Sequence, residues 1–180
     1  LENHGLPATP ENITALLDGY LHNLRTHMPT HPGRVLPGIL PLLDALKNRS
    51  DCVLALLTGN LVRGAEIKLS HYGVWDYFAF GAFADDHHDR NELGHFARAR
   101  AQDRHGHAFA AEEIFVIGDT PRDIACGRAI GARTVAIATG IYSRPELAAH
   151  APDFLFDDFS DTAAVLTALA NPDTTSPVRR

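Results

Sequence analysis

The sequence is poor in cysteine and in long apolar runs. Its two cysteines, Cys52 and Cys126, lie far apart, so neither a zinc site nor a disulfide framework is predicted. We therefore expect reduced thiols in a cytoplasmic protein. No apolar stretch approaches the roughly 20 residues of a membrane-spanning helix. The start of the chain also lacks the charged and then apolar order of a signal peptide.

Basic residues are also scarce. There are 16 Lys and Arg against 22 Asp and Glu, which gives a formal net charge of -6, and no basic run occurs. Nucleic acid and anionic membranes are therefore excluded as expected partners, since both attract clustered positive charge. A small molecule is the expected partner.

The chain has length and apolar content for one sizeable core, with 180 residues of which 45% are hydrophobic. Apolar residues between Glu11 and Met28 recur at helical spacing and predict one amphipathic helix. The breaker cluster at 30–33 then separates an appendage, 1–32, from a main domain, 33–170. We expect 171–180 to be disordered. Because the chain begins with Leu1, we expect a processed or truncated fragment.

Predicted strands and helices alternate through the main domain. This order is typical of an α/β fold with a mainly parallel sheet and helices on both faces. The predicted strands are 52–57, 77–80, 114–117, 134–138 and 154–156. The predicted helices are 38–47, 61–72, 91–103 and 121–130.

Polar residues follow two of these strands. Ligands of open parallel sheets bind beyond the carboxyl ends of the strands. Thr58, Gly59 and Asn60 place a hydroxyl and flexible amides there, although the same residues are common in turns. Asp119 and Asp123 place two carboxylates across a strand-to-helix turn, where Mg²⁺ could bind carboxylate oxygens together with water and substrate oxygens.

An alternative reading exists for the second of these carboxylates. Thr120 and Asp123 form the pattern of a capping box, with Pro121 at the favoured first helical position. Asp123 could therefore serve only to cap the helix. Asp119 has no such capping duty.

These motifs, in this order, resemble those of the haloacid dehalogenase-like hydrolases, in particular the phosphoglycolate phosphatase-like branch. The resemblance covers about residues 33–160. It implies a Rossmannoid core, preceded by the remnant of a helical cap. It also implies that Thr58 binds the transferring phosphoryl group and that Asp119 ligates Mg²⁺ directly. Asp123 would ligate it through water or hold the ligand shell in place. Arg90 stands where the family places a Lys or Arg that neutralises phosphate charge.

The family's nucleophilic aspartate is absent from this sequence. Its Asp-x-Asp-x-Thr pattern, at the end of the first core strand, occurs nowhere in the 180 residues. By the resemblance, that strand would lie between the strands that end at Thr58 and Gly118. We expect these two strands either to pair directly or to take a strand from another copy of the chain. We also expect a homodimer built partly through the helix at 11–28.

The acidic loop before the helix at 91–103 offers further metal ligands. Asp86, His87 and His88 combine carboxylate with imidazole, which suits zinc, manganese or iron better than magnesium. The alternative is that the histidines are solvated and that Asp89 forms a capping box with Glu92.

From the motifs and the resemblance we expect a metal-dependent phosphoric-ester hydrolase, either a phosphatase or a phosphodiesterase. Metal-activated water would take the place of the missing nucleophile. Thr58, Gly59, Asn60 and Arg90 would bind the substrate. The resemblance implies Mg²⁺, with Mn²⁺ or Zn²⁺ as alternatives, and an open cap would favour bulky or diester substrates. Two other hypotheses remain: an inactive fragment that binds metal, phosphate or itself, and one half of a split phosphatase.

Overall fold

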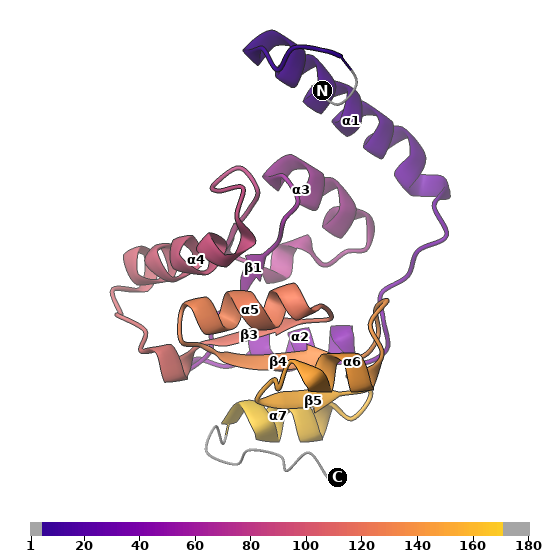
Figure 1. Cartoon of the computed structure of the whole chain (residues 1–180). Coiled ribbons are helices and arrows are strands. Elements are labelled where there is room, and N and C mark those ends of the chain that lie inside the picture. Colours follow the sequence, from indigo (N-terminus) through magenta and orange to yellow (C-terminus); the bar gives the residue numbers. More distant parts are fainter. Residues whose placement is uncertain (1–4, 171–180) are drawn as a thin grey trace.

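The computed structural model describes residues 5–170 and shows an α/β protein in which strands and helices alternate (Figure 1). The strands are β1 (Ala55–Leu57), β2 (Phe80–Ala82), β3 (Phe115–Gly118), β4 (Arg133–Ile137) and β5 (Phe154–Phe156). The α-helices are α1 (Pro10–His27), α2 (Ile39–Lys47), α3 (Val62–His71), α4 (Arg90–His105), α5 (Pro121–Ala129), α6 (Arg144–Ala149) and α7 (Thr162–Ala170). The fold class predicted from the sequence is therefore confirmed.

All strand pairs in the described residues are parallel, but they form two sheets. One sheet pairs β1 with β2, and the other has the order β3-β4-β5. Direct pairing of the strands that end at Thr58 and Gly118 was one of two expectations, and it is wrong. Each of these strands keeps one edge without a partner strand in the described part of the chain. Between residues 5 and 170, no backbone ladder joins the two sheets.

Helices and side chains hold the two sheets together. On one face of the three-stranded sheet, Leu42 and Leu46 of α2 and Val165 of α7 pack together, and Leu54 beside β1 joins them. On the other face, Ile124 of α5 and Leu147 of α6 pack on β4.

Two further contacts cross from the first sheet to the second. Leu57 of β1 packs against Val116 and Ile130. Helix α4 lies so close to α5 that a Cβ on Gly94 would come 2.9 Å from Ile130 Cγ2. Both sheets are thus anchored to one set of helices.

Several element boundaries differ from those predicted. The strand predicted at 77–80 begins at Phe80, because Trp75–Tyr77 form a 3₁₀ turn that ends before it. The strand predicted at 52–57 shortens to Ala55–Leu57. Helices α6 and α7 were not predicted. The tail at 171–180 lies outside the described residues.

Helix α1 stands away from the core and makes few contacts with it (Figure 1). Leu21 is buried, and Tyr20 packs on Gly64 of α3, but Ile13 and Leu16 remain 41% and 54% exposed. Part of the apolar stripe that the periodicity predicted therefore remains exposed. None of the helices in the described part of the chain combines the length and apolarity needed to cross a membrane.

The turn at Gly38 joins the segment after α1 to the core. Gly38 has a φ of 78° and caps α2, and a Cβ there would collide with the backbone carbonyl of Phe159. We predict that Gly38→Ala lowers the free energy of unfolding by about 2–4 kcal/mol, because the variant adds a backbone clash to a left-handed conformation. Urea unfolding measures this loss.

A second glycine with a positive φ serves as the control, because it has the left-handed conformation of Gly38 without the backbone clash. Gly73 has a φ of 69°, but a Cβ there would meet nothing within 4 Å. Gly73→Ala is therefore expected to cost only about 1 kcal/mol, the cost of the left-handed conformation. Equal losses in the two variants would show that the contact with Phe159 does not matter.

Candidate functional site

The site predicted from the strand ends begins at Thr58, directly after β1. Its hydroxyl oxygen accepts hydrogen bonds from the Asn60 backbone N–H at 3.2 Å and from the Asn60 side-chain amide at 2.8 Å. The side-chain carbonyl oxygen of Asn60 in turn accepts a bond of 2.7 Å from the Lys68 ammonium group of α3. Gly59 lies between them and is exposed.

Asp123 lies in the first turn of α5 and is buried, with a side-chain exposure of 6%. One carboxylate oxygen accepts bonds from the Thr120 backbone N–H at 3.0 Å and from the Thr120 hydroxyl at 2.8 Å. The capping box predicted for Thr120 and Asp123 is therefore present. The other oxygen accepts a bond from the Arg90 guanidinium group.

Arg90, the first residue of α4, links the two strand-end motifs. Its NH2 group forms the ion pair with Asp123, and its NH1 group lies 3.5 Å from the position of a Cβ on Gly59. Its Nε is buried and donates to no acceptor among the described residues. Its backbone carbonyl accepts a bond of 3.2 Å from the Cys126 thiol, which fixes α4 against α5. The structure thus brings Thr58–Gly59, Arg90 and Asp123 into one region.

Asp119, directly after β3, is half-buried. Within residues 5–170, neither of its carboxylate oxygens has a hydrogen-bond or ion-pair partner. Its side chain lies against Gly140, where any Cβ would collide with the carboxylate. The absent side chain at Gly140 therefore leaves room for this carboxylate at the end of the sheet.

The acidic loop makes contacts of its own. Asp86 forms a bidentate ion pair with Arg100, at 2.6 and 2.7 Å, and accepts from the Phe83 backbone N–H at 2.9 Å. The His87 ring stacks on the His88 ring, and His87 Nδ1 accepts from the Asp89 backbone N–H. The described residues contain no group of three or more His, Cys, Asp or Glu that could hold a metal ion. A metal role for this loop stays a prediction, and these contacts do not support it.

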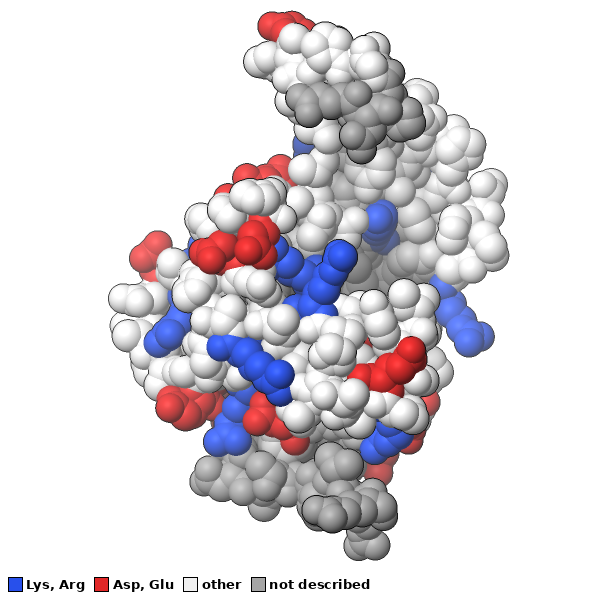
Figure 2. Space-filling model, in the orientation of Figure 1, with Lys and Arg blue, Asp and Glu red and all other residues white. Residues whose placement is uncertain are grey.

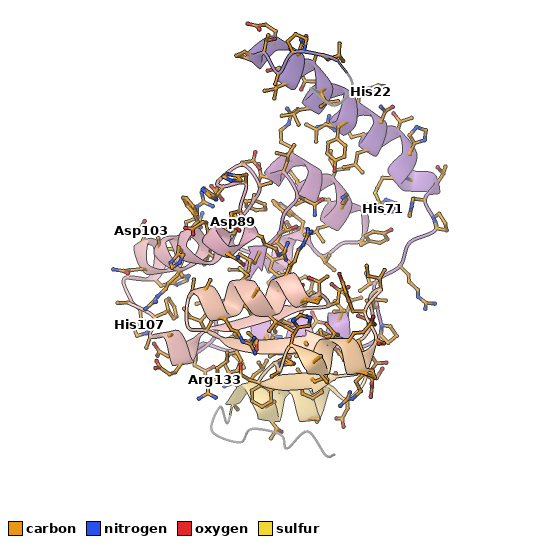
Figure 3. All side chains as sticks on the ribbon, in the orientation of Figure 1. His22, His71, Asp89, Asp103, His107 and Arg133 are labelled. Atoms are coloured by element: carbon orange, nitrogen blue, oxygen red, sulfur yellow. The ribbon has the colours of Figure 1, made fainter. Side chains whose placement is uncertain are left out.

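Asp89, labelled in Figure 3 at the start of α4, caps that helix. Its carboxylate accepts from the Asn91 backbone N–H at 2.9 Å. Asp89 therefore caps the helix as a single N-cap residue, and the capping box predicted for Asp89 with Glu92 is not formed, because the carboxylate bonds to the Asn91 N–H instead. This cap fixes the start of α4 and so the position of Arg90.

The ion pair with Arg100 makes the contribution of Asp86 to stability dependent on pH. The hydrogen bonds from Arg100 hold the pKa of Asp86 below its usual value. A carboxyl with a lowered folded-state pKa stabilises the fold above its unfolded pKa of about 3.9, and this contribution is lost as the pH falls through the folded value. We predict that Asp86→Asn costs about 1 kcal/mol at pH 7, a modest loss because solvent reaches the guanidinium group, and that the difference from wild type shrinks below about pH 4.

Urea unfolding at pH 7 and pH 3 measures this difference. Asp51→Asn is the control, because Arg49 and Asp51 form a similar bidentate pair on the surface. The control is expected to unfold as the wild type does at both pH values. A loss in Asp86→Asn that does not change with pH would contradict the prediction.

Lys68, which contacts the candidate site through Asn60, was not predicted from the sequence. It occupies a place on the inner stripe of the predicted helix at 61–72, which otherwise carries Leu61, Gly64, Ala65 and Leu69. A charged residue on such a stripe signals a polar partner. Figure 2 shows Lys and Arg side chains gathered near the middle of one face, between the places of α3 and α5 in Figure 1.

Comparison of the sequence with known proteins agrees with the fold. Residues 93–162 match the family model HAD-hydrolase-like, a range that contains Asp119 and Asp123. The chain is 29% identical over 168 residues to Probable phosphatase IndB of Dickeya dadantii, which covers 91% of this chain and 70% of that protein. It is also 36% identical over 55 residues to Pyrophosphatase PpaX of Anoxybacillus flavithermus, covering 31% of this chain and 26% of that protein.

Solved structures show the same fold. A hydrolase from Pseudomonas syringae matches with a TM-score of 0.68 at 20% identity, over 90% of this chain and 75% of that one. A predicted phosphoglycolate phosphatase from Haemophilus somnus matches with a TM-score of 0.66 at 22% identity, over 82% of this chain and 61% of that one. The chain thus spans less than two thirds of the second structure. The resemblance to the haloacid dehalogenase-like hydrolases, stated above from the motifs, is confirmed.

Proposed function

We propose that this protein is a phosphoric-ester hydrolase whose site lies at the carboxyl ends of β1 and β3. The observation that carries the proposal is the position of Arg90, which pairs with Asp123 and lies beside Gly59. A guanidinium group between the two strand ends suits the binding of phosphate oxygens. The relatives named as phosphatases support the same reaction class. A small phosphorylated molecule is the proposed substrate.

The carboxylates at this site fit a magnesium ion better than a zinc ion. Mg²⁺ binds to one or two protein carboxylates and keeps water and substrate oxygens in its shell, whereas a catalytic zinc site uses three protein ligands that include His or Cys. Asp119 offers two oxygens without a partner in the described residues, and Asp123 is held in place by Thr120 and Arg90. A bound divalent cation would supply Lewis acidity at the phosphoryl oxygens and lower the pKa of water.

We propose water as the nucleophile, since no residue of this sequence matches the family's nucleophilic aspartate. The chain's own groups would then bind and orient the ester. The Thr58 hydroxyl donates to a phosphoryl oxygen, and Arg90 neutralises the charge on the phosphoryl group. Gly59 and Asn60 shape the loop that receives it.

The proposal is tested by incubating the purified chain with a nitrophenyl phosphate monoester and, separately, a diester. Mg²⁺, Mn²⁺ and Zn²⁺ are added in turn, and release of nitrophenol is followed. Turnover that depends on the cation is the expected result. No turnover of either ester with any of the three cations would overturn the proposal and favour an inactive protein that binds metal or phosphate.

The open strand edges favour a second candidate, one half of a split phosphatase. β1 and β3 each lack a partner strand on one edge within residues 5–170, and Ile117 of β3 is 37% exposed although helices cover the sheet. An extended apolar segment from another polypeptide would pair both edges. Turnover that appears only when a peptide with an Asp-x-Asp-x-Thr strand is added would identify this case.

Self-association through α1 is also proposed. The exposed residues Ile13 and Leu16 lie on one side of α1 and form an apolar surface that a second copy could cover. Sedimentation at micromolar concentration tests it, and a clean monomer would overturn it.

A further inference from the structure

Three side chains in a row link α3 to the end of β1: Lys68, Asn60 and Thr58. All three are half-buried, and the two bonds that join them are 2.7 and 2.8 Å long. Their donor and acceptor roles follow from chemistry alone. A Lys ammonium group can only donate, so the Asn60 carbonyl oxygen must face Lys68. The Asn60 amide nitrogen must then face Thr58 and donate to it.

The orientation of the Asn60 amide determines which hydrogen bonds the Thr58 hydroxyl can make. A hydroxyl oxygen has two acceptor sites and one proton. Both acceptor sites are used, one by the Asn60 side chain and one by the Asn60 backbone N–H at 3.2 Å. The hydroxyl proton has no acceptor among the residues that the structure describes. Thr58 is therefore left as a donor, at the strand end where the phosphoryl group would bind.

We infer that Lys68 is a positioning residue: by fixing the orientation of the Asn60 amide, it makes the Thr58 hydroxyl a dedicated donor to an anionic oxygen. This inference rests on the function proposed above and deepens it. Without Lys68, the Asn60 amide is free to turn over. Its carbonyl oxygen then accepts the Thr58 proton, and the donor is lost to the substrate.

Binding of inorganic phosphate in the presence of Mg²⁺, measured by calorimetry on the full chain, tests the inference. Lys68→Met is expected to weaken phosphate binding by about tenfold, the effect of one hydrogen bond to a charged group. Lys68→Arg retains a donor and is expected to stay close to wild type. Lys47→Met is the control for charge, because Lys47 contacts Asp76 and Tyr77 instead.

A double-mutant cycle separates positioning from direct contact with phosphate. If Lys68 acts through Thr58, Lys68→Met has no further effect once Thr58 is replaced by valine. Additive losses would show that Lys68 binds phosphate itself and would overturn the inference. An unchanged affinity in Lys68→Met would overturn it as well, while leaving the proposed function intact.

A second readout does not need substrate. The side-chain amide of Asn60 is expected to give one sharp pair of NMR signals in the wild type and broadened signals in Lys68→Met. Unchanged signals would overturn the inference even if the wild type neither bound phosphate nor hydrolysed an ester. A wild type that hydrolyses no ester would overturn the proposed function instead.

Discussion

Replacing Asp119 with asparagine is expected to lower the turnover of a phosphoric ester by about a hundredfold or more. The variant keeps the size of the side chain and removes its negative charge, which is what a divalent cation at the end of β3 would bind. Nitrophenol release at saturating Mg²⁺ measures the loss.

Stability is expected to behave differently from activity in this variant. The Asp119 carboxylate is half-buried and has no partner within residues 5–170, so neutralising it removes a cost of burial rather than a contact. Without metal, the free energy of unfolding of Asp119→Asn in urea is therefore expected to equal that of the wild type or to be slightly higher. Mg²⁺ should raise the stability of the wild type by mass action and leave that of Asp119→Asn unaffected.

Asp157 provides the matched control. It follows β5 as Asp119 follows β3, but its side chain is 81% exposed and pairs with Arg144 on the surface. Asp157→Asn is expected to keep full turnover. If Asp119→Asn is as active as Asp157→Asn, the end of β3 is not the reacting site.

Replacing Arg90 with methionine is expected to lower the free energy of unfolding by about 3 kcal/mol. The substitution leaves the Asp123 carboxylate, which is only 6% exposed, without its cationic partner. Removing one member of a buried ion pair is costly because the other charge stays buried. Thr120 still donates two hydrogen bonds to Asp123, so the loss stays at the lower end of the range for such pairs. Urea unfolding at pH 7 measures it.

Two further variants test the physical cause. Arg144→Met breaks an exposed pair with Asp157 and is expected to cost less than about 1 kcal/mol. Adding Asp123→Asn to Arg90→Met is expected to recover part of the loss, because the unpaired charge is removed. Equal losses in Arg90→Met and Arg144→Met would mean that burial of Asp123 contributes nothing.

The order of strands and helices could be predicted because hydrophobic periodicity and turn residues act locally. β5 was predicted at its observed bounds, and the capping box of Thr120 and Asp123 was read from four adjacent residues. The strand near Phe80 was placed three residues too early, since a 3₁₀ turn and a strand both accept aromatic residues. Helices α6 and α7 are short or almost uniformly apolar, which leaves little helical periodicity to detect.

The site was harder to predict than the fold because it depends on contacts between distant residues. Residue types at the strand ends were enough to propose Thr58, Asp119 and Asp123 as candidates, and their roles stay predictions. Spacing along the chain could not show that Asp86 pairs with Arg100, nor that Lys68 reaches Asn60. Both contacts are set by how the helices pack on the two sheets.

The separation of the two sheets also has a consequence for cooperativity. No ladder hydrogen bond joins β1 to β3 in the described residues, so the β1–β2 unit shares its stability with the larger sheet only through side chains such as Leu57 and through the contact of α4 with α5. Side-chain packing between two sheets can be lost in a partial opening of the structure. A continuous ladder of backbone hydrogen bonds is lost only in a larger opening. Amide protons of β1 and β2 should therefore exchange with solvent through partial opening, while those of β4 exchange only when the whole chain unfolds.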